Sequence, residues 1–343
     1  MSKFESEINF QPQALRELID SDAPVRAAEG LRERNVPAVL TVARGSSGNA
    51  VTFFRYLLGR YLGIPAAAVE PSLLTVYDAP FKAAGFAALA VSQSGRSEDV
   101  RITFEKLAGT AALSLSVTND EASPMAGIAD VHLFQGVGKE EAVAATKTFT
   151  SQMMLLALVV AHWSGDEELL EALRAVPGAM QQLLGEQEEI NAASLRLAHA
   201  KQLYVLGRGL SLAAAQEAAL KLKETTYKGT QAYSSAEFQH GPFAALDRRS
   251  PVILMGLSDA TRSSNEQLLT RLTEIGADVT VVSADRDLLE MGRTRVPLPG
   301  GLHPATEAFL HVLVGQLMSL HLTSTLGLDP DQPRNLKKVT TTV

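Results

Sequence analysis

Short runs of apolar and β-branched residues alternate along the chain with longer stretches in which apolar residues recur at helical spacing. This alternation is typical of βαβ units, in which helices connect parallel strands and cover both faces of a sheet. The candidate strands cover residues 37–44, 86–92, 111–118, 201–208, 250–256 and 277–284. The sequence therefore predicts an α/β fold with a parallel sheet in each half of the chain.

The two halves also resemble each other in detail. Residues 42–45 match residues 206–209, and serine and small residues follow each segment. An internal repeat of this length indicates a duplicated domain. We predict an N-terminal helical segment, a first domain, a linking pair of helices broken at Pro177-Gly178, a second domain and a C-terminal tail. Their expected bounds are 1–35, 36–165, 166–200, 201–326 and 327–343.

Composition narrows the class of protein. The 343 residues are 46% hydrophobic and 20% charged, which is typical of a globular chain with room for two cores. A net charge of -7 argues against a nucleic-acid partner. The longest apolar run, Met153 to Trp163, is too short to cross a bilayer and reads as a buried helix, so we expect no membrane span.

The N-terminus lacks the continuous apolar core of a secretory signal, so we expect a cytoplasmic protein. No cysteine is present, which excludes disulfides, thiolate zinc sites and a cysteine nucleophile. The seven histidines include no close pair at zinc-ligand spacing, and we therefore expect no metal site.

Two serine-rich turns lie between strand and helix in the first half. Ser46 and Ser47 follow one predicted strand, and Ser92, Ser94 and Ser97 follow another. Helix N-termini at the edge of a parallel sheet present free N–H groups to an anion, and hydroxyls add further donors for a phosphate monoester. The alternative is that these serines only cap helices. The equivalent turns of the second half carry fewer hydroxyls, so only the first half looks built for phosphate.

A dinucleotide site is the competing interpretation of the second half. Gly207-Arg208-Gly209 follows a predicted strand, but Leu212 replaces the third glycine of the G-x-G-x-x-G pattern. The sequence evidence for a dinucleotide site is therefore weak.

Glu217, Lys221 and Glu224 are spaced by four and three residues and share one face of a predicted helix. The spacing alone favours a solvated face with supporting ion pairs. The functional alternative is a buried general base, Glu224, whose neighbours set its charge. A short way along the chain, His240-Gly241-Pro242 leaves an imidazole on a loop, where it can reach a substrate.

Six sequence marks occur in the order in which they occur in the SIS (sugar isomerase) domain family. They are E-I-x-x-Q-P at 7–12, S-Q-S-G at 92–95, V-A-x-T-K-x-F at 143–149, A-L-K-L-K-E at 219–224, H-G-P at 240–242 and D-Q-P-R-N-L at 331–336. Over nearly its whole length the chain resembles this family, and most closely the isomerase half of glucosamine-fructose-6-phosphate aminotransferase and its stand-alone relatives. The resemblance implies two tandem SIS domains, each a doubly wound parallel sheet flanked by helices.

The resemblance also implies roles for individual residues. Glu224 matches the family's proton-transferring carboxylate, His240 its ring-opening histidine, and Lys338 the lysine that contacts the open-chain carbonyl end. The implied substrate-binding residues are Ser46, Ser47, Ser92, Gln93, Ser94, Ser97, Val143, Ala145, Glu217 and Lys221. The family implies a homodimer in which the histidine loop reaches the neighbouring subunit's site, and it implies no cofactor.

This sequence departs from the family in two places. The aminotransferase has an N-terminal glutaminase domain with a cysteine nucleophile, and neither is seen here, so we expect glutamine not to be the ammonia source. Lys337-Lys338-Val339 stands where the family has A-K-S, so the choice of lysine depends on the register. We therefore expect a glucosamine-6-phosphate deaminase. The alternatives are a deglycase for a fructosyl amino acid 6-phosphate and a non-catalytic sugar-phosphate sensor.

Overall fold

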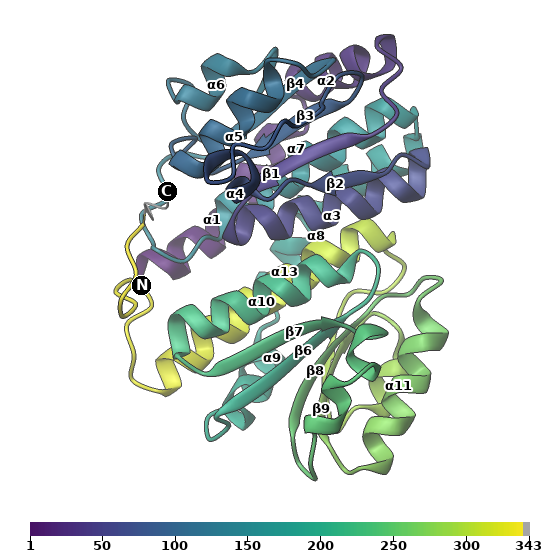
Figure 1. The fold of residues 1–343 in the computed structure, drawn as a ribbon. Coiled ribbons are helices and arrows are strands. Elements are labelled where there is room, and N and C mark those ends of the chain that lie inside the picture. The colour runs from purple at the N-terminus through teal and green to yellow at the C-terminus, as the bar shows by residue number, and fades with distance from the viewer. Residues whose placement is uncertain (339–343) are drawn as a thin grey trace. The chain divides into compact units, whose positions relative to one another are not determined.

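The computed structural model describes residues 1–338, and the chain divides into two compact units that are treated separately below. The first, called the β1–β5 unit, contains residues 13–141, residues 147–174 and the tail from residue 336. The second, called the β6–β10 unit, contains residues 1–12, 142–146 and 175–335. Each unit holds one five-stranded sheet (Figure 1).

The sheet of the β1–β5 unit is parallel throughout and has the strand order β2-β1-β3-β4-β5. Its strands are β1 (Val39–Ala43), β2 (Ala66–Ala68), β3 (Ala87–Val91), β4 (Leu113–Thr118) and β5 (Val131–Phe134). The β1 and β3 strands are neighbours in the register Val39 to Ala87 and Ala43 to Val91. Every residue of β3 and β4 is buried, as expected for strands covered on both faces.

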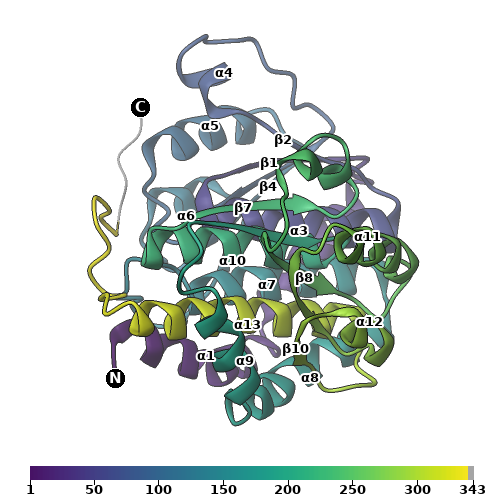
Figure 2. The ribbon, with the colours of Figure 1, turned by 90° about the horizontal axis from the view of Figure 1, so that it is seen from below.

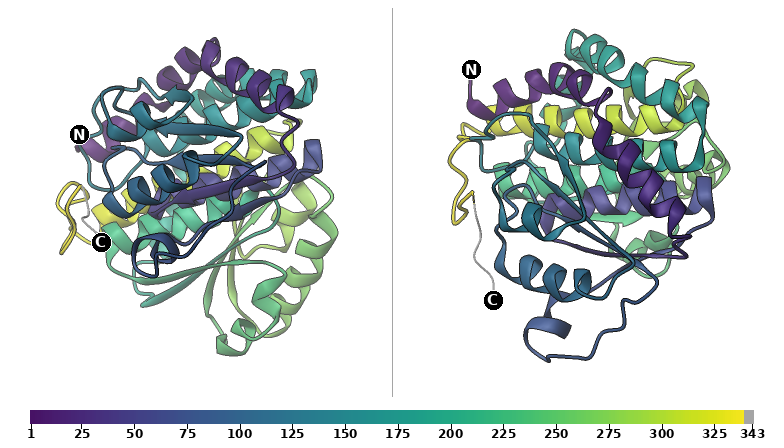
Figure 3. Two further views of the ribbon diagram at one scale, coloured as in Figure 1. Left: turned by 45° about the horizontal axis from the view of Figure 1, so that its top comes forward. Right: turned by 90° about the horizontal axis from the view of Figure 1, so that it is seen from above.

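Helices connect these strands. They are α2 (Asp22–Glu33), α3 (Gly45–Leu62), α4 (Pro71–Thr75), α5 (Glu98–Ala108), α6 (Pro124–Ile128) and α7 (Lys147–Ser164). The apolar run predicted to be a buried helix lies within α7, in which only His162 and Ser164 are not fully buried. Figure 3 shows these helices on the two faces of the sheet.

The sheet of the β6–β10 unit is also parallel, with the order β10-β9-β8-β6-β7. Its strands are β6 (Gln202–Gly207), β7 (Gly229–Ser234), β8 (Pro251–Gly256), β9 (Asp278–Ser283) and β10 (Thr294–Pro297). Its helices are α9 (Glu188–Arg196), α10 (Ser211–Thr226), α11 (Arg262–Glu274), α12 (Arg286–Met291) and α13 (Pro304–Thr325), with short 3-10 turns η1 (Glu237–Gln239) and η2 (Pro242–Ala245). The remaining helices, α1 (Lys3–Leu18) and α8 (Glu167–Leu184), each run from one unit into the other along the chain.

Helix α10 carries the predicted catalytic stripe and packs closely against α13 (Figures 1 and 2). A Cβ atom at Gly315 of α13 would lie 2.5 Å from the Cβ of Ala218 on α10. Such contact between small residues brings the two helix backbones together and fixes the orientation of α10 about its own axis.

The predicted fold class is confirmed, because both halves form parallel sheets flanked by helices. The predicted helix break at Pro177-Gly178 is wrong. Helix α8 continues through Pro177 and ends at Leu184, and α9 begins at Glu188. Buried residues at helical spacing on both sides of the proline hold α8 together despite the lost N–H donor. No helix of the described residues is long and apolar enough to span a bilayer.

Candidate functional site

The two serine-rich turns of the β1–β5 unit meet at one edge of its sheet. Ser46 and Ser47 lie in the first turn of α3, directly after β1, and Ser97 directly precedes α5, six residues after β3 ends. Because β1 and β3 are parallel neighbours, both turns lie beyond the carboxyl ends of the strands. This edge therefore places the N-termini of α3 and α5 beside the predicted hydroxyl groups.

The side chains of these serines make few of the hydrogen bonds expected of helix caps. Ser97 occupies the N-cap position of α5, but its side chain makes no capping hydrogen bond. Ser92 and Ser94 accept hydrogen bonds at 3.2 Å from the backbone N–H groups of Gly95 and Arg96, which shape the loop rather than cap a helix. Gly95 has a φ of +60°, which suits glycine in this tight turn. In the first turn of α5, the backbone N–H of Val100 donates to the carboxylate of Asp99 at 2.8 Å. The hydroxyl of Ser97 and the N–H groups that precede Val100 are thus the donors suited to an anion.

An ion pair between a half-exposed arginine and a buried aspartate connects the two helix starts. Arg44, in the N-cap position of α3, donates from Nε to the carboxylate of Asp99 at 3.0 Å. Asp99 lies in the first turn of α5 and is 2% exposed. Sequence reasoning did not single out this arginine. The sequence signal for its role was an arginine at the end of a predicted strand, followed by glycine and two serines.

On α10 of the β6–β10 unit, the predicted stripe forms a chain of ion pairs. The ammonium of Lys221 lies 3.3 Å from a carboxylate oxygen of Glu217 and 2.6 Å from one of Glu224. Glu217 and Lys221 are each 1% exposed at the side chain, whereas Glu224 is 20% exposed. The expectation of a solvated face is therefore wrong for two of the three residues. Only Glu224 remains accessible to a ligand.

His240 follows the 3-10 turn η1 and is exposed on the same unit. The turn is anchored by Phe238, which is fully buried and contacts the rings of Tyr204, Tyr233 and Phe243 at centroid distances of 5.5 to 6.0 Å. Gly241 has a φ of +129°, a conformation open to glycine, and the chain then enters η2 at Pro242. The fold thus holds the base of the loop rigidly and leaves the imidazole at its tip.

Val143 and Ala145 lie in the segment 142–146, which belongs to the β6–β10 unit. Glu7 accepts a hydrogen bond at 3.3 Å from the backbone N–H of Ala142. Gln11 donates to Gln316 of α13 at 2.7 Å. The E-I-x-x-Q-P mark at residues 7–12 therefore supplies two buried polar side chains, which connect α1 to this segment and to α13.

Specific contacts hold the described part of the C-terminal tail, and over these residues the alternative of a frayed end is wrong. Asp331 accepts from the backbone N–H groups of Lys3 and Phe4 at 2.8 and 2.9 Å and so caps the start of α1. The guanidinium of Arg334 stacks over the ring of Tyr227 at 3.7 Å. Tyr227 is the left-handed C-cap of α10, three residues after Glu224.

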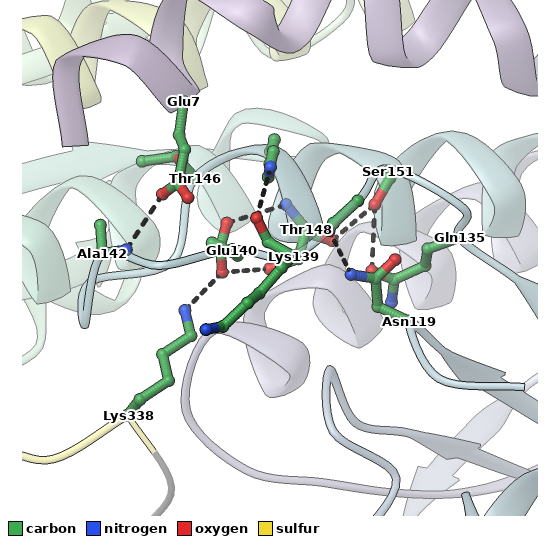
Figure 4. Close-up of polar contacts among 12 residues, drawn as sticks. Glu7, Asn119, Gln135, Lys139, Glu140, Ala142, Thr146, Thr148, Ser151 and Lys338 are labelled. Atoms are coloured by element: carbon green, nitrogen blue, oxygen red, sulfur yellow. Dashed lines mark hydrogen bonds and ion pairs between the residues drawn. The ribbon is translucent and has the colours of Figure 1, made fainter. Parts of the chain in front are cut away.

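Lys338 makes a contact that sequence reasoning missed. Its ammonium lies 2.7 Å from the carboxylate of Glu140, and both residues belong to the β1–β5 unit (Figure 4). In the sequence, Glu140 stands in the charged run Lys139-Glu140-Glu141, which reads as a surface segment. Its position three residues before the V-A-x-T-K-x-F mark was the one available signal.

The structure thus groups the predicted residues into sets. One set contains the serines and Gln93 at the edge of the first sheet, and Lys338 with Glu140 belongs to the same unit. The other unit holds Glu217, Lys221 and Glu224 on α10, His240 on its loop, and Val143 and Ala145. Val339 lies outside the described residues, and the predicted tail 327–343 is described only to residue 338. Among the described residues, no group of three or more potential metal ligands occurs.

Both halves of the chain match one family of sugar-phosphate proteins. The SIS domain family matches residues 31–162 and 196–325, and the chain belongs to this family. The two matches each contain one of the parallel sheets.

The chain is similar over nearly its whole length to the following three proteins. The glutamine–fructose-6-phosphate aminotransferase (isomerizing) of Aquifex aeolicus is 31% identical over 341 residues, which are 98% of this chain and 57% of that protein. The C-terminal domain of glucosamine-fructose-6-phosphate aminotransferase from Francisella tularensis has a TM-score of 0.86 at 25% identity and covers 97% of this chain and 98% of its own. Glucosamine-6-phosphate deaminase from Thermotoga maritima shares the fold, with a TM-score of 0.76 at 22% identity over 99% of this chain and 100% of its own. The chain spans a little over half the length of the curated relative and corresponds to its sugar-isomerase portion.

Proposed function

We propose that the protein is an isomerising glucosamine-6-phosphate deaminase, which converts glucosamine 6-phosphate and water to fructose 6-phosphate and ammonia. The carrying observation is the ion-paired chain on α10, in which Lys221 holds one oxygen of Glu224 at 2.6 Å. A carboxylate can accept a proton, and the adjacent ammonium fixes where this one lies. Membership of the SIS family supports a sugar phosphate as the ligand.

The chemistry divides among three residues. His240 assists ring opening, and Lys338 contacts the carbonyl end of the open chain. The carbonyl acidifies the proton on C2, Glu224 removes it to give an enolamine, and the proton returns to C1. Water then hydrolyses the resulting C2 imine and releases ammonia. The overall conversion is redox-neutral.

The phosphate is assigned to the edge of the first sheet. Ser46, Ser47, Ser92, Ser94 and Ser97 would hold it together with the N-terminal N–H groups of α3 and α5. Gln93 lies in the same loop. Changing Ser94 to Ala should raise KM, because loss of a donor to a charged group costs roughly 1.5 to 3 kcal/mol. The exposed Ser72 offers a matched Ser-to-Ala control, and an unchanged KM for Ser94→Ala would assign Ser94 to loop structure alone.

The deciding experiment measures ammonia release from glucosamine 6-phosphate by purified, metal-stripped protein, with no glutamine present. Glu224→Gln should keep ligand binding and lose about 10²- to 10⁴-fold in turnover. Lys223→Gln, which changes an exposed charge on the same helix turn, is the control. Near-normal turnover by Glu224→Gln would return the α10 stripe to a purely structural role.

Parallel assays separate the alternatives. Strong preference for a fructosyl amino acid 6-phosphate would make the protein a deglycase. Thermal stabilisation by aminated hexose phosphates without any turnover would make it a sensor.

We also propose a homodimer in which His240 acts on the neighbouring subunit's substrate. The exposed imidazole on a loop anchored by Phe238 supports this arrangement. Mixing inactive His240→Ala subunits with inactive Glu224→Gln subunits should then restore part of the activity. Mixed dimers that form without any recovery would place the histidine in its own subunit's site.

A further inference from the structure

The carboxylate of Glu140 is unusual because it is fully buried and yet forms an ion pair with a lysine from the tail of the chain. Its side chain is 0% exposed, whereas that of Lys338 is 26% exposed. The partly exposed lysine therefore approaches the buried carboxylate from the accessible side, and Figure 4 shows its side chain directed at Glu140.

Glu140 lies at the start of the long buried helix α7. One oxygen accepts from the backbone N–H of Thr148 at 3.1 Å, and the other accepts from the hydroxyl of Thr148 at 2.6 Å. Both donors, together with the positive end of the α7 dipole, favour the ionised carboxylate. These two contacts come from α7 itself and do not involve the tail.

Among the described contacts of Glu140, the one with Lys338 comes from the tail of the chain. The same oxygen that accepts the Thr148 hydroxyl accepts the ammonium of Lys338 at 2.7 Å. The contact selects Lys338 rather than Lys337, which is exposed. It therefore resolves the register of Lys337-Lys338-Val339 that the sequence left open.

We propose that Glu140 is a positioning residue that holds the Lys338 amine in place. The catalytic part of this proposal rests on the proposed function, whereas the contact between the two residues is independent of any substrate. The Lys338 amine can donate hydrogen bonds to a sugar carbonyl or hydroxyl oxygen only if it is held within reach of that oxygen.

The contact is tested first without substrate. The rate at which an acylating reagent modifies Lys338 at one fixed pH is measured by mass spectrometry in the full-length protein, in the wild type, Glu140→Gln and Glu141→Gln. Glu140→Gln should raise this rate several-fold, because the amine loses the carboxylate that holds it at 2.7 Å. Glu141→Gln removes the same charge from the exposed neighbour and should leave the rate unchanged. Equal rates in all three proteins would overturn the proposal.

The catalytic part is tested on glucosamine 6-phosphate. Glu140→Gln should lower kcat about tenfold or more and leave KM within twofold. Glu140→Asp, which retains the charge, should recover part of the lost kcat. An equal loss of kcat in Glu140→Gln and Glu140→Asp would reject a role through Lys338. If the wild type fails to turn over this substrate, the proposed function fails, while the labelling experiment still decides whether Glu140 holds Lys338.

Discussion

Replacing Lys221 by Met should strongly destabilise the β6–β10 unit. The lysine is 1% exposed and faces the equally buried Glu217 at 3.3 Å and the more exposed Glu224 at 2.6 Å. Removing one partner of a buried ion pair commonly costs 3–5 kcal/mol, since the remaining charge has lost its nearest counter-ion in a low-dielectric site. We therefore expect a loss of about 3–5 kcal/mol, to which the partly solvated Glu224 contributes the smaller share.

The assay is urea unfolding followed by far-ultraviolet circular dichroism. Arg101→Met is the control, because Arg101 pairs with Glu105 at 2.9 Å on α5 with both side chains substantially exposed. Its loss should cost under about 0.5 kcal/mol. The double variant Glu217→Gln/Lys221→Met should be more stable than Lys221→Met alone, because the buried negative charge is then also removed. A cost below about 1 kcal/mol for Lys221→Met, or no recovery in the double variant, would refute the reasoning.

Three further predictions follow from single contacts. Burial lowers the pKa of His311 to about 4. The neutral ring therefore contributes of order 3 kcal/mol to the free energy of unfolding above about pH 6.5, and this contribution is lost as the pH falls toward 4. Urea midpoints should depend less on pH over this window in His311→Gln than in the wild type. Gly95→Ala should cost about 1–2 kcal/mol of stability because its backbone is left-handed, and it should raise KM because the new Cβ would lie 2.4 Å from the hydroxyl of Ser123. Gly127→Ala is the control, since its Cβ would meet open space. Thermal melts of the two variants and KM for the sugar phosphate check this. Asp331→Ala should lower stability by about 0.5–2 kcal/mol through loss of the α1 cap, and an unchanged melting temperature would contradict that role.

The sequence pattern located the centre of each sheet and missed its edges. The six predicted strands correspond to β1, β3 and β4 and to β6, β8 and β9, which are the three inner strands of each sheet. The four missed strands are all at edges and are short, partly exposed or polar, such as β2 (Ala66–Ala68). A strand covered on two faces needs a continuous apolar run, whereas an edge strand can be held by its backbone pairing and leaves little trace in composition.

The polar residues were harder to interpret, because spacing does not reveal burial. Glu217 and Lys221 have the spacing of a solvated ion-paired face, and only the packing of α10 within the unit buries them. Glu140 reads as part of a charged surface run until the start of α7 and the returning tail enclose it. Both cases depend on contacts between residues far apart in the chain, which a local pattern cannot encode.

The same physical reasoning explains why the two related sheets differ in their suitability for phosphate. In the β6–β10 unit, the hydroxyl of Ser211 is buried and already bonded to the backbone of Arg208 and to the carbonyl oxygen of Met255 at 2.9 to 3.0 Å. The backbone N–H of Ser258 is taken by the carboxylate of Glu307 at 2.9 Å, and burial raises the pKa of that carboxyl. In the second sheet, the hydroxyl of Ser211 and the backbone N–H of Ser258 are therefore satisfied internally, whereas the hydroxyl of Ser97 beside the first sheet makes no capping hydrogen bond. This difference between the two related sheets supports the proposal that the phosphate binds at the edge of the first.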